Sequence, residues 1–300
     1  MHQSRQGYWS AIGCYVIWGV MPIYMRLMKS VPPLQIVTHR LLWSCLILLG
    51  ILWFSKNLKS LISVITPKLL AIYTLSALCI GSNWLLYVLG TNQGQVTEVS
   101  LGYFINPLVS VLLGVVVLGE RLRPWQIAAV GLGVIGVSYL SYSYGSIPWL
   151  ALGLALSFGF YGLIRKMAPL GATQGLGLET FILLPFALAY ITYLMFTHQS
   201  AFTNQGWGID LLLLSAGLVT TVPLLLFNNA AQKISLTLMG VFQYIGPSLQ
   251  FLIGIFLYDE PISHEVLTGF ICVWVGLFIF AMEGFWRHQT RSRNTAYFTT

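Results

Sequence analysis

Long apolar stretches separated by short polar breaks dominate the pattern along this chain. A helix rises about 1.5 Å per residue, so about 20 apolar residues cross the roughly 30 Å hydrocarbon core of a bilayer. The pattern therefore predicts an all-α polytopic membrane protein. Its ten transmembrane helices are expected at residues 8–28, 34–54, 68–90, 98–119, 124–142, 147–168, 176–197, 209–230, 237–258 and 263–286.

The composition supports this prediction and excludes two other classes of protein. Hydrophobic residues make up 57% of the 300 positions and charged residues 8%, with a mean hydropathy of +0.78. A soluble domain usually carries about 25% charged residues, so a soluble fold is excluded. The net charge of +7 does not indicate nucleic acid as a partner, because the Lys and Arg residues are scattered among the breaks.

The distribution of positive charge predicts the orientation of the chain in the membrane. Lys and Arg concentrate in cytoplasmic breaks, and one alternating assignment places twelve of the fifteen on the same side as the N-terminus. Arg26 and Lys29 fall on the opposite side, and Arg40 lies inside a span. We therefore expect an N-terminal tail, 1–7, and a basic C-terminal tail, 287–300, that are both cytoplasmic.

The second half of the chain repeats the first half at a shift of 140 positions. The segment GYFINPLVSVLLGVVVLGE, residues 102–120, aligns without gaps with FQYIGPSLQFLIGIFLYDE, residues 242–260. The two repeats, 8–142 and 147–286, hold five spans each. Because five is an odd number, the second repeat enters the bilayer upside down. Transporters built from inverted repeats bind their substrates near the midplane, between the two copies.

Several motifs resemble those of one transporter family. THRLLWS, GSNWLL, SLGYFINPLVS and FQYIGPS, together with ERL and DEP after the fourth and ninth spans, resemble EamA-type members of the drug/metabolite transporter superfamily. Within that superfamily the resemblance is to the RarD group of bacterial inner-membrane proteins. It implies a ten-helix carrier of small molecules, an exporter or permease in the inner membrane. It supplies no set of substrate-binding residues.

Prolines and polar side chains at mid-membrane depth indicate the substrate site. An interior proline frees a backbone carbonyl, which must face a water-filled cavity or pack against other helices. We expect helix breaks at Pro22, Pro107 and Pro247, around a central cavity lined by the first, third, fourth, sixth, eighth and ninth spans. Aromatic and amide groups there suit an amphipathic or aromatic solute. The candidates are Trp18, Asn83, Trp84, Tyr103, Phe104, Asn106, Gln243 and Tyr244.

Five polar residues, including the candidate Asn83, can be explained by a structural role as well as by a functional one. Asn83 suits either a cavity wall or a hydrogen bond between helices, whereas Asn228 and Asn229 are more typical of interhelical hydrogen bonds. Glu120 and Glu260 match across the repeat at the ends of spans. A carboxylate there stabilises the N-terminus of the next helix.

Three ionisable residues inside spans are candidates for the transport pathway. His39 and Glu179 occupy equivalent positions in the two repeats, and histidine titrates near pH 6.5, which suits proton coupling. Arg40 is a candidate ligand or gate; alternatively, His39 and Arg40 bond backbone carbonyls at an interface. Their depths differ from that of Glu179 by roughly 15 Å, so an ion pair between them is not expected.

The sequence predicts a secondary transporter that works by alternating access, because no ATP-binding or catalytic motif accompanies the spans. We expect export of a small amphipathic or aromatic metabolite or drug, with protons as a candidate coupling ion and no cofactor or metal. One alternative is a membrane-embedded enzyme acting on a lipid, which needs clustered carboxylates or histidines. Another is a structural membrane subunit, which needs a packed interior. Whether the chain forms a homodimer is left open.

Overall fold

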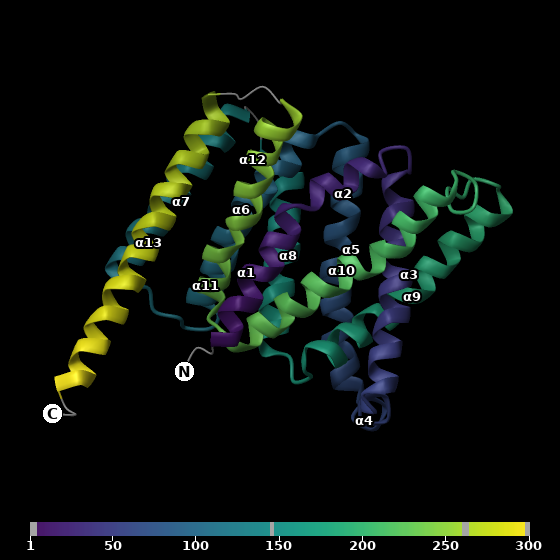
Figure 1. Ribbon diagram of the computed structural model, residues 1–300, viewed down its shortest axis with the longest axis horizontal. Coiled ribbons are helices and arrows are strands. Elements are labelled where there is room, and N and C mark those ends of the chain that lie inside the picture. The colour runs from purple at the N-terminus through teal and green to yellow at the C-terminus, as the bar shows by residue number, and fades with distance from the viewer. Residues whose placement is uncertain (1–4, 145–146, 260–263, 298–300) are drawn as a thin grey trace.

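The computed structural model describes residues 5–144, 147–259 and 264–297, and every element in these ranges is a helix (Figure 1). Nine described segments are long and apolar enough to cross a bilayer, and His264–Phe280 is a shorter tenth, which confirms the predicted all-α fold. In chain order the helices are α1 (Arg5–Gly19), α2 (Met21–Leu27), α3 (Pro33–Phe54), α4 (Asn57–Ser63), α5 (Pro67–Asn92), α6 (Val96–Val116), α7 (Pro124–Tyr144), α8 (Trp149–Met167), α9 (Ala172–Phe196), α10 (Trp207–Lys233), α11 (Leu236–Gln243), α12 (Ile245–Tyr258) and α13 (His264–Tyr297).

Two of the ten crossings are broken helices. The first crossing consists of α1 and α2, which are separated at Val20, and the ninth consists of α11 and α12, which are separated at Tyr244. The fourth crossing, α6, runs through Pro107 without interruption. The prediction of a break at Pro107 is therefore wrong: a proline removes one hydrogen bond, and the rest of the helical ladder continues around it.

Two further elements differ from the expected pattern. A short helix, α4, occupies the polar break after the second crossing. The tenth helix, α13, continues to Tyr297, so most of the segment expected as a C-terminal tail, 287–300, extends this helix.

One pair of close contacts between helices follows the symmetry of the sequence repeat. A Cβ atom added at Gly19 would lie 2.8 Å from Cβ of Leu249, and one added at Gly159 would lie 2.5 Å from Cγ1 of Val109. Gly19 is equivalent to Gly159 at the shift of 140 positions, and Val109 is equivalent to Leu249. The same contact is therefore made twice between the two repeats: α1 of the first repeat packs against α12 of the second, and α8 of the second packs against α6 of the first.

Helices α7 and α13 pair by the same rule at one side of the molecule, at the left of Figure 1. A Cβ added at Gly136 would lie 3.2 Å from the carbonyl oxygen of Gly269, and one at Gly276 would lie 2.8 Å from that of Ala129. These contacts are also equivalent at the shift of 140 positions. The fifth and tenth crossings thus pack on each other, and the other eight form the main bundle.

The outer surface of the bundle is apolar. Phe54, Trp207 and Phe256 have exposed fractions of 86%, 85% and 80%. In water such side chains would favour association, whereas lipid tails cover them without cost. A polar side chain inside the bundle therefore indicates either a polar contact between helices or the wall of a cavity.

Candidate functional site

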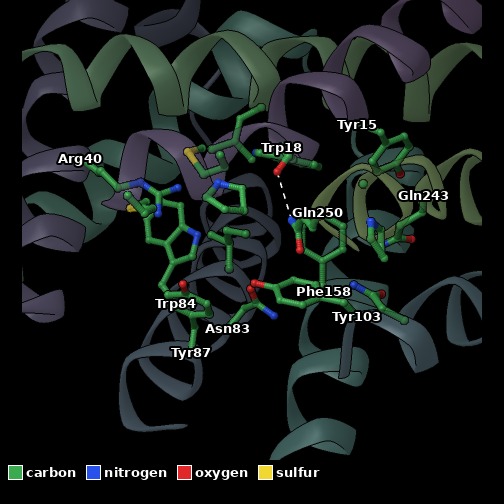
Figure 2. Close-up of a pocket in the computed structure, with 18 of the residues that line it drawn as sticks. Tyr15, Trp18, Arg40, Asn83, Trp84, Tyr87, Tyr103, Phe158, Gln243 and Gln250 are labelled. Atoms are coloured by element: carbon green, nitrogen blue, oxygen red, sulfur yellow. Dashed lines mark hydrogen bonds between the residues drawn. The ribbon is translucent and has the colours of Figure 1, made fainter. Parts of the chain in front are cut away.

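A cavity of about 420 Å³ lies between the two repeats (Figure 2). Its size is within the range of small-molecule sites, and its wall is mostly aromatic and aliphatic with a few polar groups. The second crossing, α3, contributes to the wall as well as the six crossings expected from the sequence. The lining residues are Tyr15, Trp18, Met21, Pro22, Met25, Arg26, Val37, Arg40, Ile80, Asn83, Trp84, Tyr87, Tyr103, Asn106, Phe158, Leu224, Gln243, Gly246, Pro247 and Gln250.

The break between α1 and α2 forms one wall of the cavity. Pro22 has no N–H, so the carbonyl of Trp18, four residues earlier, has no helical partner. The side-chain amide of Gln250 donates a hydrogen bond of 3.1 Å to this carbonyl (Figure 2). Gln250 lies on α12, so the second repeat satisfies the backbone group that the proline frees in the first. Sequence reasoning missed Gln250, although it lies three residues after Pro247.

The break between α11 and α12 lies against the first crossing. Pro247 and Gly246 at the start of α12 line the cavity, and a Cβ at Gly246 would lie 3.8 Å from the carbonyl oxygen of Tyr15. Pro107, the symmetry mate of Pro247, is outside the lining, and its carbonyl oxygen would lie 2.6 Å from a Cβ at Gly240. The two equivalent prolines thus have different surroundings.

Arg40 reaches the cavity from α3 and is fixed by two neighbours. Its Nε donates a hydrogen bond of 2.7 Å to Oγ1 of Thr220, and its guanidinium carbon lies 5.6 Å from the ring centre of Trp84. That distance is within the range of a cation–π interaction. The side chain is half-buried, whereas neighbouring His39 is buried.

Amide and hydroxyl groups complete the polar part of the wall. Asn83 donates to the carbonyl of Leu154 at 2.9 Å and to Oγ of Ser157 at 3.1 Å, so it both bridges α5 to α8 and lines the cavity. Oδ1 of Asn106 and the hydroxyl of Tyr15 are buried and have no hydrogen-bond partner in the described part of the chain. Because both atoms are excluded from solvent, a solute would reach them only after neighbouring side chains move.

Five predicted site residues lie outside the cavity lining: His39, Phe104, Pro107, Glu179 and Tyr244. The ring of His39 packs 5.2 Å from that of Phe202, and its Nδ1 has no hydrogen-bond partner among the described residues. The hydroxyl of Tyr244 donates to the carbonyl of Phe104, its equivalent in the first repeat, at 3.3 Å.

Glu179 forms a buried ion pair with Arg165. Nη1 of Arg165 lies 3.5 Å from Oε1 of Glu179, and the two side chains are 0% and 1% exposed. Ser76 donates to the same carboxylate oxygen at 2.6 Å, and the hydroxyl of Tyr161 lies 3.3 Å from Oε2. A Cβ at Gly175 would lie 2.0 Å from Nη1 of Arg165, so only glycine leaves room for the guanidinium.

Arg165, one of the twelve positive residues assigned to the cytoplasmic side, lies in the last turn of α8 and is completely buried, so it pairs with Glu179 instead of facing solvent. One signal was available: Tyr161 and Arg165 are four residues apart on α8, as are Gly175 and Glu179 on α9. Residues at this spacing share a helix face. A face that carries a charge or a small residue inside a span is typical of a polar contact between helices.

Aromatic rings separate this ion pair from the cavity. Phe158 lines the cavity, and its ring centre lies 5.9 Å from that of Tyr161 and 5.0 Å from that of Phe227. Tyr161 and Phe227 stack at 5.7 Å. At the other end the cavity reaches Arg26 on α2, which is exposed. The cavity is therefore accessible from the end of the bundle at which α2 lies and closed toward the end at which α1 begins. Figure 1 shows the positions of α1 and α2.

Other polar residues of the spans have structural contacts. The carboxylate of Glu120 accepts hydrogen bonds from the backbone N–H groups of Leu236 and Thr237 at 2.7 and 2.8 Å. It therefore caps α11 rather than the helix that follows it in sequence, which corrects the expected partner. Glu260 lies outside the described residues. Asn229 donates to Ser10 at 2.7 Å, and the other predicted interhelical amide, Asn228, is bonded by Tyr161; both confirm their expected role.

Comparisons with known proteins agree with this architecture. The sequence model of the EamA-like transporter family matches twice, at residues 5–142 and 146–282. Protein RarD of Escherichia coli (strain K12) is 42% identical over 97% of this chain and 99% of its own length. Uncharacterized transporter YojE of Bacillus subtilis (strain 168) is 38% identical over 97% and 98%. A solved crystal structure with 16% identity superposes with a TM-score of 0.68 over 92% of this chain and 97% of that chain, which shows a shared fold.

Proposed function

Because this chain belongs to the EamA-like transporter family, within its RarD group, we propose that it carries a small amphipathic or aromatic solute across the membrane. No nucleotide-binding motif is found in the sequence, so the proposed mechanism is secondary transport by alternating access. The two repeats would rock about the cavity between them and expose it to one side at a time.

The observation that carries this proposal is the asymmetric access to the cavity. The cavity reaches exposed Arg26 at one end, while Phe158, Tyr161 and Phe227 pack across the other end. Beyond these rings the Arg165 and Glu179 side chains are paired and excluded from solvent. A site open to one side only is what one state of an alternating-access carrier requires.

The direction of transport and the coupling ion are parts of the proposal. On the orientation expected from the Lys and Arg residues, both termini are cytoplasmic in a bacterial inner membrane, and the cavity is open to the periplasm. We propose export, with protons entering in exchange. The described cavity lining contains no carboxylate or imidazole, so His39 would act through the adjacent Arg40, and Glu179 through the ring of Tyr161.

The cavity argues against the two alternative functions. A structural membrane subunit would have a packed interior, and a cavity of about 420 Å³ does not fit that description. An enzyme acting on a lipid would need clustered carboxylates or histidines at the site, and the described lining has neither. The family assignment likewise favours a transporter over an enzyme.

The test is flux through the purified protein in proteoliposomes. A panel of radiolabelled aromatic and amphipathic solutes is measured with and without a pH gradient, against empty liposomes. Leu224→Trp, in the cavity wall, should abolish flux because the larger ring occupies the space of the solute. Leu218→Trp, on the same helix but 55% exposed toward lipid, should leave it unchanged. Absence of flux for the whole panel, or equal flux in the two variants, would overturn the proposal.

A further inference from the structure

The charge on the cavity wall has one sign. Arg26 and Arg40 line the cavity, and its described lining includes no Asp or Glu. The ion pairs of the described residues use Arg123 and Arg165, so Arg40 has no acidic partner there. A cation removed from bulk water inside a membrane protein is costly and usually faces a partner or a ligand. The wall of the cavity would therefore stabilise a negatively charged solute, because the described wall contains no negative charge of its own.

The guanidinium of Arg40 is held in one orientation with most of its donors unused. Thr220 is fixed in turn, because its hydroxyl donates to the carbonyl of Ala216 at 2.8 Å while it accepts from Nε of Arg40. A guanidinium carries five N–H groups, and the four on its terminal nitrogens have no hydrogen-bond acceptor in the described part of the chain. Such a planar fork matches the two oxygens of a carboxylate.

The titratable neighbours of Arg40 do not neutralise it. The groups close enough to act on its charge are the hydroxyls of Tyr24, Tyr87 and Tyr103. A tyrosine hydroxyl is uncharged near neutral pH. The positive charge at this end of the cavity is therefore available to a solute.

Aromatic surface lies next to the charge. Figure 2 shows Arg40 and Trp84 on one side of the cavity and Gln243 on the other, with Trp18 and Phe158 between them in this view. The rings of Trp18 and Phe158 meet edge to face at 5.6 Å. A solute with a negative group on Arg40 would thus place its apolar body against these rings.

We propose that the solute of this cavity is an aromatic organic anion whose carboxylate binds the guanidinium of Arg40. The proposal rests on the proposed transport function and names its substrate class. It assigns Arg40 the role of specificity-determining ligand and Thr220 the role of positioning residue.

The test compares three probes that share a phenylpropyl skeleton and differ in charge. Binding of 3-phenylpropionate, 3-phenylpropionamide and 3-phenylpropylamine to the purified protein in neutral detergent is measured by calorimetry. We expect the carboxylate to bind at least about tenfold more tightly than the amide, because a charge-assisted bidentate pair replaces a neutral contact. The amine should bind most weakly. Equal binding of the three, tighter binding of the amine, or no binding of the carboxylate overturns the proposal.

Variants locate the preference at Arg40. Arg40→Gln should reduce the ratio of carboxylate to amide affinity to about one, and Arg40→Lys should retain part of it. Thr220→Val should lower the ratio without abolishing it. Arg5→Gln removes an exposed arginine from the start of α1 and should leave the ratio unchanged. A preference that survives in Arg40→Gln overturns the assignment. Because the ratio is first measured in the natural protein, the proposal remains testable if this variant does not fold.

Flux measurements keep this inference separate from the proposed function. Binding of the carboxylate without flux in proteoliposomes would contradict transport and retain the anion site. Flux of the amide or the amine at rates equal to the carboxylate would contradict the anion site and retain transport.

Discussion

The amide of Gln250 on α12 and the carbonyl of Trp18 on α1 are joined by a hydrogen bond of 3.1 Å. This carbonyl is the one that Pro22 leaves without a helical partner. The first repeat therefore keeps its helix break at the cavity because the second repeat supplies the missing donor. The bond also ties together the two broken crossings, which have to move relative to each other if the cavity is to open to the opposite side.

We expect Gln250→Leu to destabilise the protein by about 1 kcal/mol, because the carbonyl of Trp18 is left without a donor. In a Pro22→Ala background the helical N–H returns, and the same substitution should cost less than half as much. Thermal unfolding of the four proteins in detergent gives the coupling between the two sites. Equal costs in the two backgrounds would show that Gln250 does not compensate for the proline.

The two ion pairs of the described residues have the same distance, 3.5 Å, and different environments. Glu179→Gln leaves Arg165 buried without a counter-charge, and we expect a loss of about 3–5 kcal/mol. Glu283→Gln leaves Arg123, whose side chain is 47% exposed, and the loss should stay below about 1 kcal/mol because solvent screens that charge. Midpoints of thermal unfolding in detergent test the contrast. Similar losses in both variants would contradict the burial argument.

A close approach of α3 and α10 depends on Gly217. A Cβ there would lie 2.4 Å from Cβ of Trp43 and 2.8 Å from the backbone nitrogen of Ser44, so Gly217→Ala must push the helices apart. We expect a loss of about 1–3 kcal/mol, the usual cost of overpacking. Gly208→Ala on the same helix meets no atom within 4 Å and should be neutral or slightly stabilising. Expression level and unfolding temperature distinguish the two variants.

His39 is the residue through which the proposed proton coupling is tested. Its imidazole is buried beside Phe202, next to the cavity residue Arg40, and one ring nitrogen lacks a partner among the described residues. We expect His39→Asn to flatten the dependence of flux on pH, because an imidazole exchanges protons with its surroundings and an asparagine amide does not. His198→Asn changes an exposed histidine in the loop after α9 and serves as the control. An unchanged pH profile in His39→Asn would remove this residue from the coupling mechanism.

Much of the site was predictable from depth and residue type. Arg40, Asn83 and Asn106 are polar groups inside apolar spans, and the cost of burying such groups makes a cavity or a partner necessary. Trp18 and Tyr103 follow from the same argument applied to aromatic groups near helix breaks. His39 and Glu179 are also polar groups inside apolar spans, yet they lie outside the cavity lining. Depth along a helix does not determine which neighbour a side chain faces.

The ten crossings, the two repeats and their register could be read from the sequence alone, because they depend on hydropathy, length and self-similarity along one chain. Which helices break and which charges meet depends instead on contacts between segments that are distant in the sequence. Pro107 and Pro247 are equivalent in sequence, yet α6 is continuous while the ninth crossing breaks at Tyr244. Whether a proline bends, breaks or merely interrupts one hydrogen bond depends on which groups of other helices can satisfy its freed carbonyl. For Pro22 that group is the side chain of Gln250, which lies in the other repeat, and the sequence around Pro22 does not identify it.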